Sequence, residues 1–170
     1  MNLKPFNVPF SLLGDEGAAA FSAKVRDVGE LLGDTRTRAS RHPLPVKVAL
    51  QDSCHLRHAQ KLPLSSRTSL NRVPGLEIVE PAEQDLCCGS AGIYNVVQAD
   101  AARELGDRKA AHVLATGAQL YASANPGCLV QISAALNRAR QPLPALHPIE
   151  LVDASIRNVG AGRLLRSARR

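Results

Sequence analysis

Short apolar runs alternate with longer amphipathic stretches along this chain of 170 residues. The short runs are typical of buried strands, and they cover residues 46–52, 76–80, 119–125 and 144–148. In the longer stretches apolar residues recur every three or four positions, which predicts helices. These stretches are residues 16–32, 62–73, 98–116, 129–140 and 149–155. Strands separated by helices predict an α/β fold, a small parallel sheet with flanking helices.

Glycines and prolines mark the ends of these elements. Gly33 and Gly117 each follow a helical stretch, which is the usual place for a glycine that ends a helix. Residues 126–128, Pro-Gly-Cys, are expected to form a turn between the third strand and the helix at residue 129. Residues 81–92 are expected to be a loop, and the last ten residues a frayed tail.

Composition indicates a globular domain with an aliphatic core. Apolar residues make up 45% of the chain, charged residues 21% and aromatic residues only 3%. The net charge is +6, but part of the excess lies in the C-terminal segment RLLRSARR and the rest is dispersed. Because no basic face with interleaved aromatic residues is evident, we expect no nucleic-acid partner.

Location affects how the cysteines are interpreted. No apolar run approaches the length of a transmembrane helix, and the N-terminal sequence lacks a basic start followed by an apolar segment. We therefore expect a cytoplasmic protein, with peripheral attachment at the inner face of the membrane through a complex as the alternative. In a reducing compartment, four cysteines are expected to be metal ligands or redox groups rather than disulfides.

All four cysteines fall where a predicted strand ends. Cys54 follows the first strand, Cys87 and Cys88 lie side by side in the loop after the second, and Cys128 follows the third. The carboxyl ends of parallel strands meet at one edge of a sheet, so the four thiols are expected to converge there. A site of four cysteines suits zinc or an iron–sulfur cluster.

The adjacent pair favours the cluster. Structural zinc is usually held by paired C-x2-C motifs, and this sequence has none. Gly89 and Gly92, which follow the pair, would let backbone N–H groups approach the sulfurs. Such hydrogen bonds tune the reduction potential of a cluster. A catalytic dithiol or disulfide is an open alternative, and so are cysteines that serve only as small buried apolar residues.

The spacing of the cysteines resembles that of a known family, the CCG or cysteine-rich domain. Here Cys54 is followed by 32 residues, then by Cys87-Cys88-Gly89, then by 38 residues and Cys128. The family includes a heterodisulfide reductase component and the iron–sulfur proteins of lactate utilisation, anaerobic glycerol-3-phosphate dehydrogenase and glycolate oxidase. The last of these is the most similar, between about residues 18 and 155. The shared segments are DSCHLRHAQK, LCCGSAGIYNVVQ, ANPGC and HPIELVD.

The resemblance implies a cofactor and its ligands. Cys54, Cys87, Cys88 and Cys128 would hold one [4Fe–4S] cluster. The fuller family motif ends in C-x2-C, and Asn125 stands at the first of those two positions here. Four cysteine ligands argue for an ordinary [4Fe–4S] cluster and against the noncubane cluster of the heterodisulfide enzyme. Asn125 itself becomes a candidate hydrogen-bonding residue near the cluster.

The resemblance also implies a place in a complex. A flavoprotein subunit carrying FAD would oxidise glycolate to glyoxylate, and electrons would pass through this non-catalytic subunit to a membrane quinone or another acceptor. Three alternatives stay open. They are a subunit of a related lactate or glycerol-3-phosphate dehydrogenase, a structural zinc-binding module, and a nonfunctional truncated remnant.

The N-terminal part of the family has no counterpart in this sequence. Family members begin with a ferredoxin-like segment, which is followed by a first CCG repeat. We therefore expect the chain to correspond to a C-terminal portion. Residues 1–45 would be a helix and linker left from a preceding repeat, residues 46–157 the CCG domain, and residues 158–170 a basic tail.

Basic residues near the cysteines have two interpretations. His55 and Arg57 follow Cys54, and either they donate hydrogen bonds to the cluster, a substrate or a quinone, or they are solvated side chains at a helix start. The second interpretation is favoured for His58. His147, before a proline, is expected to cap the last helix. The alternative is that its side chain faces the edge of the cluster.

No residue is assigned a catalytic role. Glu83 and Asp85 are expected to be loop acids, and no pair of carboxylates is placed for acid–base chemistry. No glycine-rich nucleotide loop follows a predicted strand, which is why FAD is expected only on a partner subunit.

Overall fold

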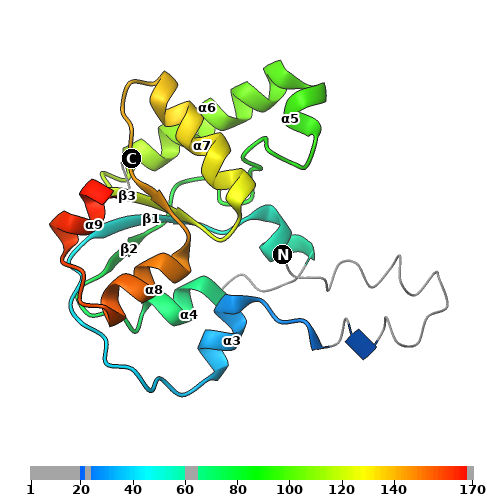
Figure 1. The fold of residues 1–170 in the computed structure, drawn as a ribbon. Helices are drawn as coiled ribbons and strands as arrows, with labels where there is room; N and C mark the ends of the chain where they lie inside the picture. The colour runs from blue at the N-terminus through cyan, green and yellow to red at the C-terminus, as the bar shows by residue number, and fades with distance from the viewer. Residues whose placement is uncertain (1–19, 22–23, 60–64, 168–170) are drawn as a thin grey trace.

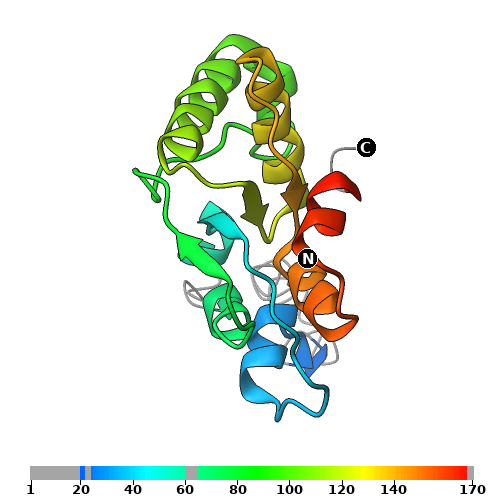
Figure 2. The same cartoon turned by 90° about the vertical axis from the view of Figure 1, so that its left-hand side faces the viewer.

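A computed structural model describes residues 20–21, 24–59 and 65–167. It shows a four-stranded parallel sheet with helices on both faces (Figures 1 and 2). The α/β fold expected from the alternation of strands and helices is therefore confirmed. Within the described ranges, no helix combines the length and the apolar character needed to cross a membrane.

The first strand along the chain lies inside the sheet. The strand order is β2-β1-β3-β4, and every neighbouring pair is parallel. The strands are β1 (Lys47–Gln51), β2 (Glu77–Val79), β3 (Leu120–Ser123) and β4 (Ala145–Leu146). All four predicted strands are present, each shorter than its apolar run. This order places the carboxyl ends of β1, β2 and β3 side by side.

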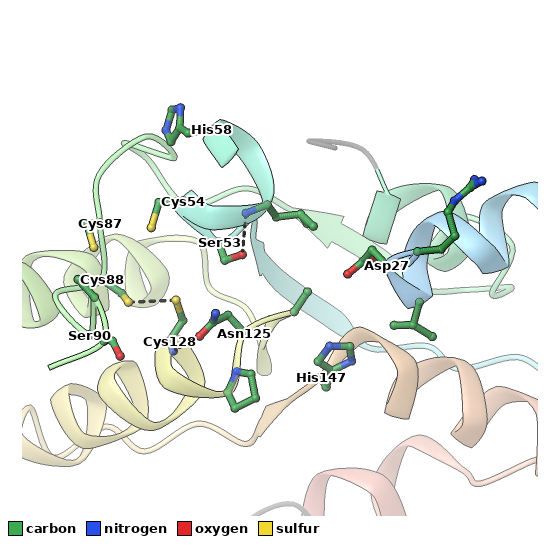
Figure 3. Close-up of a pocket in the computed structure, with 17 residues that line it drawn as sticks. Asp27, Ser53, Cys54, His58, Cys87, Cys88, Ser90, Asn125, Cys128 and His147 are labelled. Atoms are coloured by element: carbon green, nitrogen blue, oxygen red, sulfur yellow. Dashed lines mark hydrogen bonds between the residues drawn. The ribbon is translucent and has the colours of Figure 1, made fainter. Parts of the chain in front are cut away.

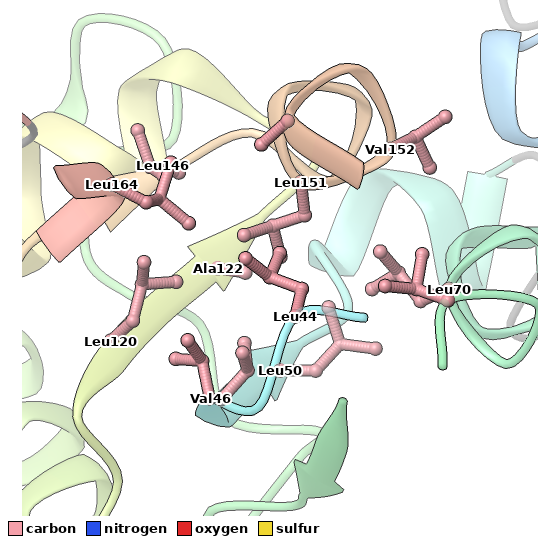
Figure 4. Close-up of a cluster of buried hydrophobic side chains, with 13 residues drawn as sticks. Leu44, Val46, Leu50, Leu70, Leu120, Ala122, Leu146, Leu151, Val152 and Leu164 are labelled. Atoms are coloured by element: carbon pink, nitrogen blue, oxygen red, sulfur yellow. The ribbon is translucent and has the colours of Figure 1, made fainter. Parts of the chain in front are cut away.

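Each face of the sheet has its own core. On one face, α4 (Ser65–Leu70), α8 (Pro148–Ile156) and α9 (Ala161–Ser167) pack on leucines and valines of the strands (Figure 4). On the other, α6 (Ala99–Ala115) and α7 (Pro126–Arg138) cover Ala49 and Tyr121. Side chains of a strand alternate between faces, so Val48 and Leu50 enter the first core and Ala49 the second.

Most predicted helices are found close to their expected positions. The longest, α6, begins one residue after and ends one residue before the predicted range, and Gly117 follows it with a φ of +65°. Within the predicted range 62–73, residues 62–64 lie outside the described residues and α4 ends at Leu70. The described chain also has two short helical segments, η2 (His55–Ala59) after β1 and α5 (Tyr94–Val97) before α6.

The expected turn at residues 126–128 is wrong, because these residues form the first turn of α7. Asn125 caps the helix, and its Oδ1 accepts a hydrogen bond from the backbone N–H of Cys128 at 3.1 Å. Pro126 occupies the first helical position, where its missing N–H costs nothing. Cys128 therefore lies on a helix rather than in a turn.

The predicted helix over residues 16–32 is also different in the structure. Residues 25–27 are not helical, and α3 covers Val28–Asp34. The break has a local cause, since Asp27 and Glu30 form a capping box that starts a new helix. Residues 16–19 and 22–23 of the predicted helix lie outside the described residues.

The C-terminal tail is ordered further than its sequence suggests. Residues 161–167 form α9, and Leu164 is 7% exposed in the first core. The last three residues lie outside the described residues. The expectation of a frayed tail from residue 161 is therefore wrong for this helix. The division of the chain at residues 45 and 157 stays a prediction.

Candidate metal centre

The four cysteines line one cavity at the carboxyl end of the sheet. Cys54 follows β1, Cys87 and Cys88 come from the loop after β2, and Cys128 lies in the first turn of α7 after β3. All four contribute to a cavity of about 880 Å³, and Figure 3 shows their sulfurs gathered at one end of it. The convergence expected from parallel-strand topology is therefore present.

Two of the thiols are buried and two lie nearer the surface. Cys88 and Cys128 are 1% and 5% exposed, and their sulfurs lie 3.0 Å apart. Cys54 and Cys87 are partly exposed, and none of the four cysteines forms a disulfide. A group bound here would have a protected inner side on Cys88 and Cys128 and a more accessible side on the other pair.

Electrostatics shows that the sulfurs influence one another. The hydrogen bond between the sulfurs of Cys88 and Cys128 lowers the pKa of Cys88 to about 6, although burial opposes this shift. The same bond raises the pKa of Cys128, as do burial and the negative charges of Cys88, Cys54 and Cys87. Repulsion among four converging thiolates is what a bound cation relieves, so the donor set suits a cationic iron–sulfur or metal group.

Gly89 allows the cysteine loop to lie against α6. Gly89 has a φ of +88°, and a Cβ added there would lie 2.4 Å from the backbone oxygen of Ala102. Gly106, one turn further along α6, faces the backbone oxygen of Cys88, which would lie at an ordinary contact distance of 3.6 Å from an added Cβ. Gly89 N–H also donates to the sulfur of Cys87 at 3.4 Å. The glycine after the pair therefore combines a left-handed backbone, a close approach and a sulfur contact.

The start of α7 is shaped to meet the same loop. A Cβ added at Gly127 would lie 2.6 Å from Oγ of Ser90, so the helix and the loop are packed closely. Asn125 lines the cavity, and its amide oxygen is used by the cap of α7. Asn125 thus orients Cys128 through the backbone N–H of that cysteine.

The basic residues proposed from sequence lie at different places. Arg57 forms an ion pair with Asp85 at 3.0 Å, between the segment after Cys54 and the cysteine loop. His58 lines the cavity. His147 caps α8 through Nδ1, as expected, and it also lines the cavity, at the end away from the sulfurs in Figure 3. The side chain of His55 lies outside the described part of the chain.

An ion pair formed two residues before Cys54 was not predicted from the sequence. Asp52 is 2% exposed, and one carboxylate oxygen lies 2.5 Å from Nη1 of Arg67 on α4. Arg67 also contacts Glu80 at the end of β2, at 2.7 Å. Burial raises the pKa of Asp52, and the contact with Arg67 opposes that rise. The pair ties the segment that leads into Cys54 to α4 and to the second strand.

Replacing Arg67 with alanine is expected to lower the free energy of unfolding by about 3–5 kcal/mol at neutral pH, because it leaves a buried carboxylate unpaired. The deficit should shrink at low pH. A carboxyl whose pKa is raised in the folded state destabilises that state as pH rises, and the loss of Arg67 strengthens this effect at Asp52. Urea denaturation at two pH values measures both effects.

Arg157→Ala is the matched control for that change. Arg157 pairs with Asp153 on the surface at 2.8 Å, with side chains 72% and 54% exposed, and such pairs contribute about 0–1 kcal/mol. Equal losses in the two variants would contradict a special role for the buried pair.

Sequence reasoning also missed how the loop is anchored to α6. Glu83, expected to be a plain loop acid, accepts hydrogen bonds from Arg108 and from His112, the latter at 2.8 Å. Its backbone oxygen accepts a hydrogen bond from Nζ of Lys109, a fully buried lysine. One feature of the sequence could have revealed Lys109: it follows Ala102 by seven residues and so shares the buried face of α6.

The residue types at the cavity can be compared with those that hold a cluster and those that hold a single ion. Among the described side chains, no group of three or more His, Cys, Asp or Glu residues lies close enough to hold one metal ion. A structural zinc ion draws four ligands to about 2.0–2.3 Å from one point. Four cysteine thiolates are the usual ligand set of a [4Fe–4S] cluster, so the residue types present fit such a group.

Comparison with known proteins agrees with this geometry. The model of the CCG family, described as a cysteine-rich domain, matches residues 48–133. The chain belongs to the CCG family. The resemblance recognised from the cysteine spacing is therefore confirmed, and the matched residues include the ends of β1, β2 and β3 with all four cysteines.

Relatives of this CCG chain are much longer proteins. It is 41% identical over 125 residues to a probable glycolate oxidase iron–sulfur subunit of Bacillus subtilis, covering 72% of this chain and 28% of that one. It is 31% identical to one component of a fumarate reductase (CoM/CoB) of Methanothermobacter marburgensis, and the match covers 76% of this chain and 27% of that one. It is 26% identical to a lactate utilization protein A of Halalkalibacterium halodurans, and the match covers 81% of this chain and 57% of that one. The CCG chain thus spans between about a quarter and three fifths of these relatives.

Proposed function

We propose that this CCG domain holds one [4Fe–4S] cluster on Cys54, Cys87, Cys88 and Cys128 and serves in electron transfer. The observation that carries the proposal is the convergence of four cysteines, none of them in a disulfide, from three strand ends on one cavity. The relative named as a probable glycolate oxidase iron–sulfur subunit supports it. The cluster, when bound, supplies a centre that accepts and releases one electron at a time.

The residues of the chain would hold and shield such a centre. Cys88 and Cys128 lie in the core between α6 and α7, which keeps water from the inner side. The N-terminus of α7 at Cys128 and the Gly89 N–H at Cys87 place positive partial charges near two sulfurs. Cys54 and Cys87, more exposed, would form the side from which electrons enter or leave.

Glycolate is the proposed substrate of the parent complex, with a flavoprotein subunit as the partner that carries FAD. Glycolate loses two electrons and two protons on becoming glyoxylate, and a membrane quinone that takes up two of each balances the reaction. The support is the 41% identity to the probable glycolate oxidase subunit. The similarity to lactate utilization proteins favours a related 2-hydroxy-acid complex as the second candidate.

A partner subunit is supported by exposed apolar side chains beside the cysteine loop. Ile93, Val96 and Val97, in and before α5, are 75%, 78% and 64% exposed. Such side chains are ordinarily buried, and a group of them at the surface is typical of an interaction site. They lie within ten residues of Cys87 and Cys88 in the sequence, so a partner that binds there would lie close to the centre.

Electron transfer is tested by cycling the reconstituted protein under anaerobic conditions. Iron and sulfide would be supplied, the protein reduced with dithionite, and the EPR spectrum recorded before and after addition of a water-soluble quinone. The expected result is a signal of the reduced cluster that the quinone removes and that dithionite restores. A protein that takes up iron but shows no reversible signal would contradict an electron-transfer role.

A further inference from the structure

The cysteine loop runs along one stripe of α6. Ala102, Gly106 and Lys109 are spaced by four and three residues, so they share a face of the helix, and all three are buried. Gly89 approaches Ala102, and the backbone oxygen of Cys88 faces Gly106. Lys109 stands next in this stripe, where its Nζ donates to the backbone oxygen of Glu83 at the start of the loop.

Burying the ammonium of a lysine at this place costs free energy, so its presence needs an explanation. Lys109 is 0% exposed, and burial lowers its pKa. The negative charges that act on it are those of Glu83, Cys88 and Asp85, and the positive charge of Arg57 opposes them. A methionine could fill the same space without the cost of burying an ion, so packing alone does not explain the ammonium.

We propose that Lys109 is the buried counter-charge of the cysteine site and sets the reduction potential of the cluster held there. The inference rests on the proposed function. Reduction adds one negative charge to a group that already lies among four thiolates. A nearby cation favours the reduced state, and a buried one is screened by salt far less than a cation on the surface.

The nearby arginines are more exposed to water than Lys109, and each is paired with a carboxylate. Arg57 is 27% exposed and is paired with Asp85, and Arg108 is 57% exposed and is paired with Glu83. Their charges are partly screened by water and by these carboxylates. The ammonium of Lys109 is buried, donates its hydrogen bond to a neutral carbonyl, and interacts electrostatically with Cys88 as well as with Glu83 and Asp85.

The test compares the reduction potentials of reconstituted wild type, Lys109→Met and Lys109→Gln, measured by EPR-monitored titration. At the midpoint potential of the wild type, the ratio of reduced to oxidised cluster should fall about tenfold in both variants, a shift of about 59 mV to more negative values. Lys109→Gln keeps a hydrogen-bond donor without the charge, and Lys109→Arg keeps the charge and should restore the potential. Arg103→Met, which removes an exposed cation of the same helix, should change the ratio less than about twofold.

The outcomes separate this inference from the proposed function. A wild-type protein without iron and sulfide would contradict the proposed function itself. Clusters in Lys109→Met and Lys109→Gln with the wild-type potential would overturn the role of Lys109 and leave the proposed function intact. If both uncharged variants fail to fold by circular dichroism, Lys109 is a structural residue and the inference is overturned. Variants that fold but load iron only when position 109 is Lys or Arg would support it.

Discussion

Replacing Cys88 with serine is expected to remove nearly all iron and sulfide from the reconstituted protein. Cys88 is the most buried of the four cysteines, and its sulfur lies 3.0 Å from that of Cys128. A serine hydroxyl is a poor ligand for iron in place of a thiolate, and the sequence has no fifth cysteine to replace the lost one. Iron and sulfide analysis after anaerobic reconstitution measures the loss, and Cys128→Ser should behave in the same way.

Ala110→Ser is the matched control. Ala110 is as buried as Cys88 and belongs to the same core between α6 and α7, but it does not line the cavity. The control introduces the same hydroxyl into the same layer, so it should retain the iron. A Cys88→Ser protein with the iron and sulfide content of the wild type would show that this cysteine is not a ligand.

Replacing Gly89 with alanine is expected to lower the free energy of unfolding by about 3–5 kcal/mol. Two causes add together. The φ of +88° is strained for any residue with a Cβ, and that Cβ would lie 2.4 Å from a backbone oxygen of α6, which cannot move aside as a flexible side chain could. Guanidinium denaturation measures the change, and the iron content of the variant should fall because the loop can no longer lie against the helix.

Gly92 provides the comparison for that effect. It has a φ of +66°, but a Cβ added there would meet no atom within 4 Å. Gly92→Ala therefore carries only the backbone strain, about 1–2 kcal/mol. If the two alanine variants were equally stable, the contact of Gly89 with α6 would not be the reason for a glycine after the cysteine pair.

The sequence was informative where local pattern and topology decide the structure. The convergence of Cys54, Cys87, Cys88 and Cys128 could be predicted because parallel strands bring their carboxyl ends to one edge. The first turn of α7 was missed because Pro126 and Gly127 are common in turns. The side chain of Asn125 and the position of the proline decide in favour of a helix.

Other features depend on packing that the sequence does not display. Gly89 is required by Ala102, which comes thirteen residues later and lies in another element. Asp52 and Arg67 pair across two segments, and nothing local indicates that a carboxylate there is buried. Lys109 looks like an ordinary residue of an Ala-rich helix until the loop covers it. At such positions the residue type is determined by neighbours that are distant in the sequence.

The most direct test of the cluster is metal analysis of the chain purified without oxygen. Iron, acid-labile sulfide and zinc would be measured per chain on the same sample. A [4Fe–4S] cluster on the four cysteines predicts about four irons and about four sulfides, with zinc near zero. About one zinc per chain without sulfide would instead establish a structural zinc module and contradict the cluster, and a folded chain that takes up no metal even after reconstitution would contradict both.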